Sequence, residues 1–337
     1  MSSIETEVVT VDPEAADAGV IERAADLIRA GDLVAFPTET VYGLGANALL
    51  PEAVAAIFEA KGRPSFNPLI VHVADVDEAK KIVAVWPPEA EILARAFWPG
   101  PLSIVLPRRS VVPDAVTGGR STVAVRVPAN PVALALLRAS GVPVAAPSAN
   151  RSEQLSPTTA SHVLAGLSGL IPFILDGGPT AAGIESTVIA ITGAEVRLLR
   201  PGPISRDEIG VLIGQTVHLP DGKPQDVHSE FASPGQMLRH YAPRAKLSIS
   251  HHPEAEVEKL LSFGERVGRL SYAKHANADL HGLTVITMPH EPNNYAAALY
   301  ARLHELDSLG VTRIVVDAPP TDERWLAIWD RLTRAST

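Results

Sequence analysis

The sequence contains no cysteine among its 337 residues. This absence excludes disulfides, thiolate metal sites and a cysteine nucleophile. No apolar run approaches the ~18 residues that a membrane-spanning helix needs. The N-terminus, "MSSIETEVVTVDPEAADAG", is acidic and lacks the basic start and apolar core of a secretory signal. We therefore expect a cytoplasmic protein that does not associate with membranes.

Positive charge is also scarce. The net charge is -9, whereas a protein whose main role is to cover nucleic acid needs a basic surface. Only a local basic cleft remains possible. The sequence has no G-x-x-x-x-G-K-[ST] phosphate loop, no H-E-x-x-H zinc motif and no G-x-S-x-G nucleophile turn. His240 and the pair His251–His252 have no partners at metal-ligand spacing, so we expect no metal site.

What is present is an alternation of helical patterns and short apolar runs, with 29 prolines placed mostly at the ends of those runs. Helices are predicted at 20–30 and 51–60, the second beginning with a first-turn proline. Predicted strands include 69–73, 103–106, 122–127, 142–146, 172–175, 186–191 and 195–199. This pattern predicts an α/β fold, with a twisted mixed sheet in the first domain.

The composition changes after residue 213. Residues 214–245 have little periodicity and many turn-forming residues, which predicts a linker, and a long loop of this kind is more often functional than idle. Residues 246–337 then alternate strands and helices again and predict a small Rossmann-like α/β domain with a parallel sheet. The predicted organisation is a catalytic domain at 1–213, a linker at 214–245 and a second domain at 246–337.

Two polar pairs flank predicted strands. Lys61 and Arg63 precede the strand at 69–73, and in an extended loop their side chains would point to the same side. Arginine offers a planar fork for phosphate, and lysine offers a point charge. Ser148 and Asn150 follow another strand at the same spacing. Loops at such junctions line the ligand crevice of open α/β sheets, although each pair taken alone is more often a solvated loop or an ordinary turn.

The stretch "PTETVYGLGAN", residues 37–47, places hydroxyls and a carboxylate at a strand tip, followed by Gly43 and Gly45. These glycines allow a tight turn or the approach of a ligand. The third glycine of a dinucleotide fingerprint is missing, so a simple turn is the alternative. Arg126 lies in an alternating strand, where it either faces solvent or binds a carboxylate. His72 also lies in a strand, and a lone strand histidine is more often structural.

No activated nucleophile stands out among these residues. The sequence instead accumulates anion-binding and hydroxyl side chains at strand ends. This pattern favours chemistry by positioning and charge stabilisation over covalent catalysis.

Six stretches resemble the YrdC/YciO family in order and spacing: "AFPTETVYGLGANA", "KGRPSFNPLIVHV", "TVAVRVP", "APSANRSEQLSPT", "ESTVI" and "LRPGPIS". The stretch "SPGQMLRHYAP", followed by a small α/β region, resembles the two-domain members, the threonylcarbamoyl-AMP synthases. The resemblance implies that L-threonine and bicarbonate form a carbamate, which attacks the α-phosphate of ATP and releases pyrophosphate. A separate downstream transferase would then move the threonylcarbamoyl group to an adenosine beside the tRNA anticodon.

The resemblance also implies the site residues. Lys61 and Arg63 would stabilise the developing phosphate charge as catalytic residues, with Mg²⁺ arriving on ATP. The positions that match the ATP site are Lys61, Arg63, Asn67, Thr122, Ser148, Asn150, Ser156, Arg200 and Tyr241. Those that match the threonine site are Thr40, His72, Arg126, Ala146 and Ser186, with Arg126 as the partner of the carboxylate. Tyr241 lies in a segment that would close over the nucleotide as a lid.

Two other functions stay open. One is a non-catalytic RNA-binding module that uses a basic concave sheet, which the acidic net charge disfavours. The other is a carbamoyltransferase that acts through a carbamoyl-adenylate. Such enzymes usually carry the YrdC-like unit inside larger chains with additional metal-binding domains, and none is present in this sequence. Contact with tRNA is possible, but the charge does not indicate it.

Overall fold

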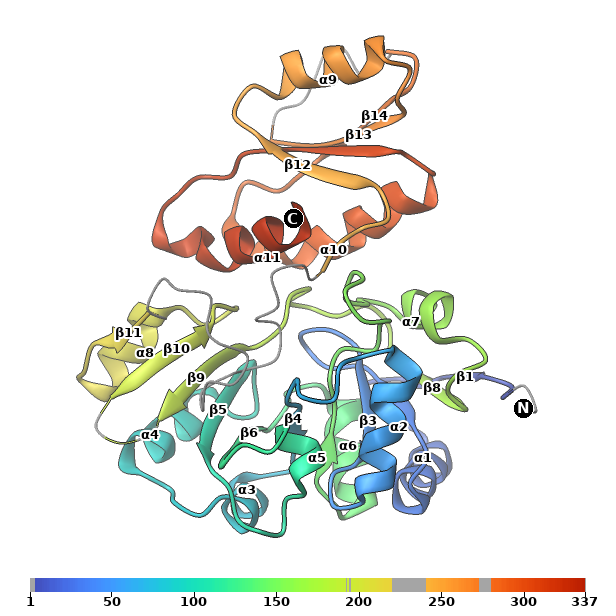
Figure 1. Cartoon of the computed structure of the whole chain (residues 1–337). Helices are drawn as coiled ribbons and strands as arrows, with labels where there is room; N and C mark the ends of the chain where they lie inside the picture. The colour runs from blue at the N-terminus through green and yellow to red at the C-terminus, as the bar shows by residue number, and fades with distance from the viewer. Residues whose placement is uncertain (1–3, 192, 194, 220–240, 273–279, 337) are drawn as a thin grey trace. The chain divides into compact units, whose positions relative to one another are not determined.

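The computed structural model describes residues 4–191, 193, 195–219, 241–272 and 280–336. The chain divides into two compact units, and Figure 1 labels their elements. The first unit comprises residues 1–152, 157–181 and 185–236, and the second comprises 153–156, 182–184 and 237–337. Two short stretches from the first two-thirds of the chain therefore belong to the second unit.

An 11-stranded sheet forms the centre of the first unit, in the order β1-β8-β2-β3-β7-β4-β6-β5-β9-β10-β11. Parallel and antiparallel pairs both occur along it, which confirms the predicted mixed sheet. The strands are β1 (Glu7–Thr10), β2 (Val34–Phe36), β3 (Gly43–Asn47), β4 (Ile70–His72), β5 (Leu102–Pro107), β6 (Thr122–Arg126), β7 (Val144–Ala145), β8 (Phe173–Asp176), β9 (Thr187–Ile191), β10 (Val196–Arg200) and β11 (Val217–His218).

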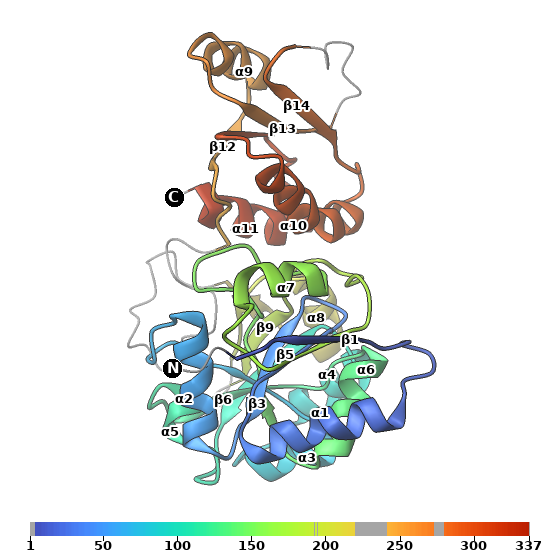
Figure 2. The same ribbon diagram turned by 90° about the vertical axis from the view of Figure 1, so that its right-hand side faces the viewer.

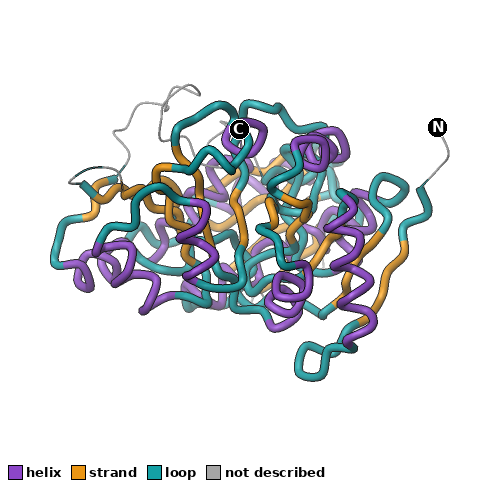
Figure 3. Tube along the Cα trace, turned by 90° about the horizontal axis from the view of Figure 1, so that it is seen from below, coloured by secondary structure: helices purple, strands orange, loops and turns teal. Residues whose placement is uncertain are grey.

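Helices flank the strands of this sheet (Figure 3). They are α1 (Ala18–Ala30), α2 (Pro51–Lys61), α3 (Val76–Ile82), α4 (Pro88–Phe97), α5 (Asp114–Thr117), α6 (Pro131–Ser140), α7 (Ala160–Leu167) and α8 (Arg206–Ile213). The apolar residues of α1 at helical spacing, including Ile21 and Ile28, are buried in one core cluster with Leu136 and Leu137 of α6. Figure 2 shows α1 and α6 side by side. Burying this stripe is what fixes both helices against the sheet.

Strand β3 is a finding that the sequence did not predict, because its residues "GLGAN" lack the alternation of a half-buried strand. The glycines serve close packing here. A Cβ on Gly45 would lie 2.8 Å from Cε1 of Phe36 and 2.9 Å from Cγ1 of Val144, closer than carbon atoms can approach. The alternative of a simple turn at Gly43 and Gly45 is wrong. These residues extend in a strand paired antiparallel with β2.

The first sheet also extends past residue 213. Val217 and His218 form β11, which pairs parallel with Val196 and Arg197 of β10 at the sheet edge. Residues 220–240 of the predicted linker lie outside the described residues, so the proposed lid over the nucleotide stays a prediction.

The second unit is a four-stranded sheet in the order β12-β15-β13-β14, and all its pairs are parallel, as predicted. Figure 1 shows one helix, α9, on one face and two helices, α10 and α11, on the other. The elements are β12 (Lys246–Ser250), α9 (Pro253–Ser262), β13 (Val267–Ser271), β14 (Leu283–Thr287), α10 (Pro292–Ser308), β15 (Arg313–Asp317), the 3₁₀ turn η1 (Glu323–Trp325) and α11 (Leu326–Ser336).

No helix within the described ranges is long and apolar enough to cross a membrane.

Candidate active site

Strand register in the first unit brings several polar side chains into one row across the sheet. His72 of β4 is the direct partner of Arg126 in β6. On the other side, β5 and β6 pair Ile104 with Val125 in antiparallel register, and continuing that register sets Ser103 opposite Arg126. The Ser103 hydroxyl lies 2.8 Å from that of Ser186, and Nη2 of Arg200 donates to Oγ of Ser186 at 3.0 Å. Residues far apart in the sequence thus form a continuous polar row.

Arg126 lies at the centre of this row, with only 4% of its side chain exposed. Its Nη2 is 2.8 Å from Oε1 of Glu39 and donates to Oγ1 of Thr40 at 3.0 Å. Its Nε donates to the carbonyl oxygen of Gly100 at 3.2 Å. The predicted choice for Arg126 between solvent and a carboxylate is thereby decided, because this guanidinium is buried beside the carboxylate of Glu39.

His72 is buried in the same row, and its ring meets that of Phe36 edge-on at 6.2 Å between centroids. Burial, and then the positive charge of Arg126, lower the pKa of His72 to about 3. The imidazole is therefore neutral at physiological pH. It contributes hydrogen-bonding atoms and no charge to the site.

The pKa of His72 predicts how stability depends on pH. In the unfolded chain His72 has its ordinary pKa of 6.5. The contribution of His72 to folding stability is therefore fully present above pH 6.5, and it is lost as the pH falls toward 3, because only the unfolded state gains a proton over this range. At 1.36 kcal/mol per pKa unit, about 2 kcal/mol should be lost between pH 7 and pH 5. Urea unfolding of the wild type and of His72→Gln at both pH values measures this. The loss should be about 2 kcal/mol smaller in the variant, and equal losses would contradict the assignment.

The cation pair sits differently from the prediction. Lys61 is the last residue of α2 and not part of an extended loop, because Gly62 takes up the left-handed conformation that caps the helix after it, with φ 61°. The Lys61 ammonium donates to the carbonyl oxygens of Ser148, at 2.6 Å, and of Asn150. Burial and the neighbouring charge of Arg63 lower the pKa of Lys61 well below its usual value. These hydrogen bonds connect the Lys61–Arg63 pair with the Ser148–Asn150 pair, through the lysine ammonium of the first and the backbone of the second.

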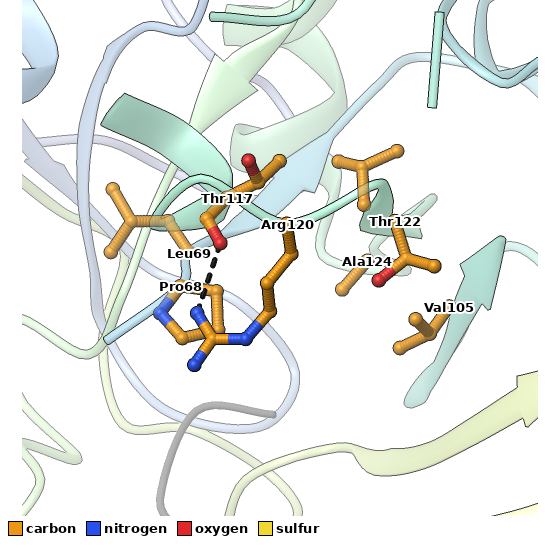
Figure 4. A pocket seen from close by; sticks show the side chains of 8 residues that line it. Pro68, Leu69, Val105, Thr117, Arg120, Thr122 and Ala124 are labelled. Atoms are coloured by element: carbon orange, nitrogen blue, oxygen red, sulfur yellow. Dashed lines mark hydrogen bonds between the residues drawn. The ribbon is translucent and has the colours of Figure 1, made fainter. Parts of the chain in front are cut away.

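Arg63 is likewise buried, and its Nη2 donates to the carbonyl oxygen of Pro68 at 3.2 Å. Pro68 also borders a small hollow that has room for about one water molecule and is partly open to solvent. Figure 4 shows its lining, in which Arg120 donates to the carbonyl oxygen of Thr117 at 3.0 Å. The residues around the hollow are Pro68, Leu69, Val105, Thr117, Arg120, Thr122, Val123 and Ala124. Its lining presents both apolar and polar atoms, and the hollow by itself is too small to hold a nucleobase.

The other predicted residues are placed as follows. Asn67 and Ala146 are buried, and the amide of Ala146 donates to the carbonyl oxygen of Ile70 at 2.9 Å. Ser156 and Tyr241 belong to the second unit.

In that unit the carbonyl oxygen of Ser156 lies 3.1 Å from Nε2 of His304. The Tyr241 ring is buried 5.8 Å from that of Tyr300 and 5.2 Å from the guanidinium of Arg331. The predicted contact of Tyr241 with the nucleotide stays a prediction.

Sequence reasoning missed two members of the polar row. Glu39 was visible as a carboxylate at a strand tip, but nothing in the sequence linked it to Arg126. Ser103 gave no signal, because a serine in an apolar strand is common. Only the strand order places them beside the predicted residues.

Both units match known families. Residues 26–202 match the family model of Sua5, YciO and YrdC, described as telomere recombination. Residues 204–337 match the model described as the C-terminal domain of threonylcarbamoyl-AMP synthase. The chain belongs to the Sua5/YciO/YrdC family. The resemblance drawn from the motifs is confirmed, for the two-domain members in particular.

Relatives of this family cover nearly the whole chain. A threonylcarbamoyl-AMP synthase of Pyrococcus abyssi is 44% identical over 94% of both chains. One of Bacillus subtilis is 42% identical over 98% of this chain and 95% of its own. The crystal structure of P. abyssi Sua5 complexed with L-threonine has a TM-score of 0.89 and 42% identity, covering 98% of this chain and 97% of that one. The structure of Escherichia coli YciO, at 23% identity and a TM-score of 0.55, shares the fold over 61% of this chain.

Proposed function

We propose that this chain synthesises threonylcarbamoyl-AMP from L-threonine, bicarbonate and ATP, with release of pyrophosphate. The observation that carries the proposal is the buried guanidinium of Arg126 within a row of hydroxyl and imidazole side chains, in the same unit as the buried cations Lys61 and Arg63. A fixed cation of this kind recognises the carboxylate of an amino acid. Relatives that match nearly the full length are threonylcarbamoyl-AMP synthases, and one solved relative is described as complexed with L-threonine.

The residues divide between the two substrates. Arg126 binds the carboxylate of threonine, while Thr40, His72, Ala146 and Ser186 surround the rest of the molecule. The predicted nucleotide set binds ATP: Lys61, Arg63, Asn67, Thr122, Ser148, Asn150, Ser156, Arg200 and Tyr241. Thr122 and Pro68 border the same hollow, and the carbonyl oxygen of Pro68 accepts a hydrogen bond from Arg63.

The reaction needs two bond-forming steps. The free amine of threonine reacts with bicarbonate to give a carbamate and water. A carbamate oxygen then attacks the α-phosphorus of ATP, and pyrophosphate leaves. Lys61, Arg63 and Arg200 stabilise the negative charge that develops on the phosphate oxygens. The described residues contain no cluster of three or more histidine, aspartate or glutamate side chains for a metal, so Mg²⁺ would be carried by ATP.

Threonylcarbamoyl-AMP is a reactive mixed anhydride, so its use requires a second enzyme. We assign the next step to a separate transferase that modifies tRNA beside the anticodon, which places the enzyme in the cytoplasm.

Pyrophosphate release tests the proposal directly. The purified full-length chain, supplied with ATP, Mg²⁺ and bicarbonate, should release pyrophosphate only when L-threonine is added, together with threonylcarbamoyl-AMP detected by mass spectrometry. Omission of bicarbonate should stop both signals, and D-threonine serves as the matched control for the substrate. Equal pyrophosphate release with and without L-threonine would refute the assignment of the substrate.

A further inference from the structure

Two buried polar atoms around Arg126 make no hydrogen bond to any residue that the structure describes. They are Oε2 of Glu39 and Nδ1 of His72, whereas Oε1 of Glu39 is paired with Arg126 at 2.8 Å. Buried polar atoms are nearly always paired in folded proteins, because an unpaired one has lost its water and gained nothing in return. Two such atoms on two residues beside one arginine therefore mark a place built for a polar ligand.

The contacts of Arg126 leave room for that ligand. Its Nε and Nη2 are engaged by Gly100, Thr40 and Glu39, whereas Nη1 donates to no described residue. A guanidinium presents five donors in a planar fork, so one arginine can hold two carboxylates. Glu39 takes one of these positions, at 2.8 Å from Nη2, and a second carboxylate can take the other.

The charges of the Arg126–Glu39 pair cancel. Arg126 carries one positive charge and Glu39 one negative charge, while the burial that depresses the pKa of His72 to about 3 keeps its ring neutral. A buried site tolerates added charge poorly, since a charge without a partner there is costly. A zwitterion adds no net charge. Its carboxylate would meet Arg126, and its ammonium would meet the unpaired Oε2 of Glu39.

We propose that Glu39 binds the α-ammonium group of the amino-acid substrate while Arg126 binds its carboxylate, so that the site selects a zwitterion. This inference rests on the proposed function and adds a substrate-binding residue to it. A 2-hydroxy acid would bring an unbalanced negative charge and leave Oε2 of Glu39 without a partner. An amino-acid ester would bring an unbalanced positive charge and leave the fork of Arg126 unpaired. Both should bind worse than threonine, for opposite reasons.

Binding calorimetry on the full-length chain tests this with three probes: L-threonine, (2S,3R)-2,3-dihydroxybutanoate and L-threonine methyl ester. The wild type should bind L-threonine at least about 10-fold more tightly than either analogue, since a hydrogen bond to a charged group is worth that much. Glu39→Gln should weaken L-threonine about 10- to 100-fold. The same variant should bind the hydroxy acid at least as tightly as the wild type does, because it removes the repelling carboxylate.

Three further variants sharpen the test. Glu39→Asp retains the charge and should recover part of the affinity for L-threonine. Glu52→Gln, on the exposed first turn of α2, is the matched control and should leave the affinity for each probe unchanged. Glu39→Ala should resemble Glu39→Gln if the carboxylate matters, and urea unfolding checks that each variant is folded.

Each of the following results would overturn the inference that Glu39 binds the α-ammonium group. If Glu39→Gln weakens both ligands equally, Glu39 only supports the fold and the inference fails. If the wild type itself binds the hydroxy acid as tightly as L-threonine, no ammonium site exists, and this comparison needs no variant. Pyrophosphate release by the wild type separates the two proposals: threonine-dependent release with an unchanged ligand ranking in Glu39→Gln would retain the proposed function and overturn this inference.

Discussion

Replacing Lys61 with methionine is expected to lower threonine-dependent pyrophosphate release at least about 100-fold. The Lys61 ammonium donates to two backbone carbonyl oxygens, those of Ser148 and Asn150. Each hydrogen bond from a charged group contributes roughly 1.5–3 kcal/mol, and the loss of one such bond corresponds to about a 10- to 100-fold change in rate. Methionine has a similar length but cannot donate a hydrogen bond. The backbone at Ser148 and Asn150 therefore loses its contacts with residue 61, and the α-phosphate loses a positive charge in the transition state.

The measurement is kcat/KM for ATP at saturating threonine and bicarbonate. Lys81→Met is the matched control, because Lys81 is an exposed lysine at the end of the short helix α3 and is remote from these motifs in sequence. Wild-type and Lys81→Met activities should agree within about 2-fold. If Lys61→Met stays folded and its activity is also within that range, the Lys61–Arg63 and Ser148–Asn150 pairs do not act together in the reaction.

Replacing Arg126 with methionine is expected to cost both stability and substrate binding. The Arg126 and Glu39 side chains are only 4% and 15% exposed, so the substitution leaves a carboxylate buried without a partner. Breaking a buried pair from one side typically costs about 3–5 kcal/mol. The double variant Arg126→Met, Glu39→Met should recover most of that loss, since no charge is then left unpaired. Neither variant should bind L-threonine measurably.

Urea unfolding of the wild type, Arg126→Met, Glu39→Met and the double variant gives the interaction energy of the pair through a double-mutant cycle. Arg95→Met provides the control at the surface, because Arg95 is 79% exposed and pairs with Glu91 four residues earlier on α4. That substitution should cost less than about 1 kcal/mol. An equally small loss in Arg126→Met would mean that water or protonation compensates Glu39, and the pair would not organise the site.

Two differences between prediction and structure have the same physical origin. The sequence around Gly43 and Gly45 carries no apolar alternation, so a strand there is invisible until Phe36 and Val144 are packed against it. Lys61 was expected in an extended loop, but helix α2 continues one residue further because Gly62 closes it. In both cases glycine acts through its backbone. A pattern of side chains cannot report that action.

The sequence by itself determined the elements that depend on local periodicity: the α/β class, most helices and strands, and the parallel sheet of the second unit. Its motifs also determined the family, because their residue types recur in a fixed order. Only the tertiary structure decided which of these residues meet. His72 and Arg126 are neighbours because β4 pairs with β6, and Glu39 reaches the same arginine from the loop after β2. Hydrogen bonding between strands distant in sequence sets that order, and no local pattern encodes it.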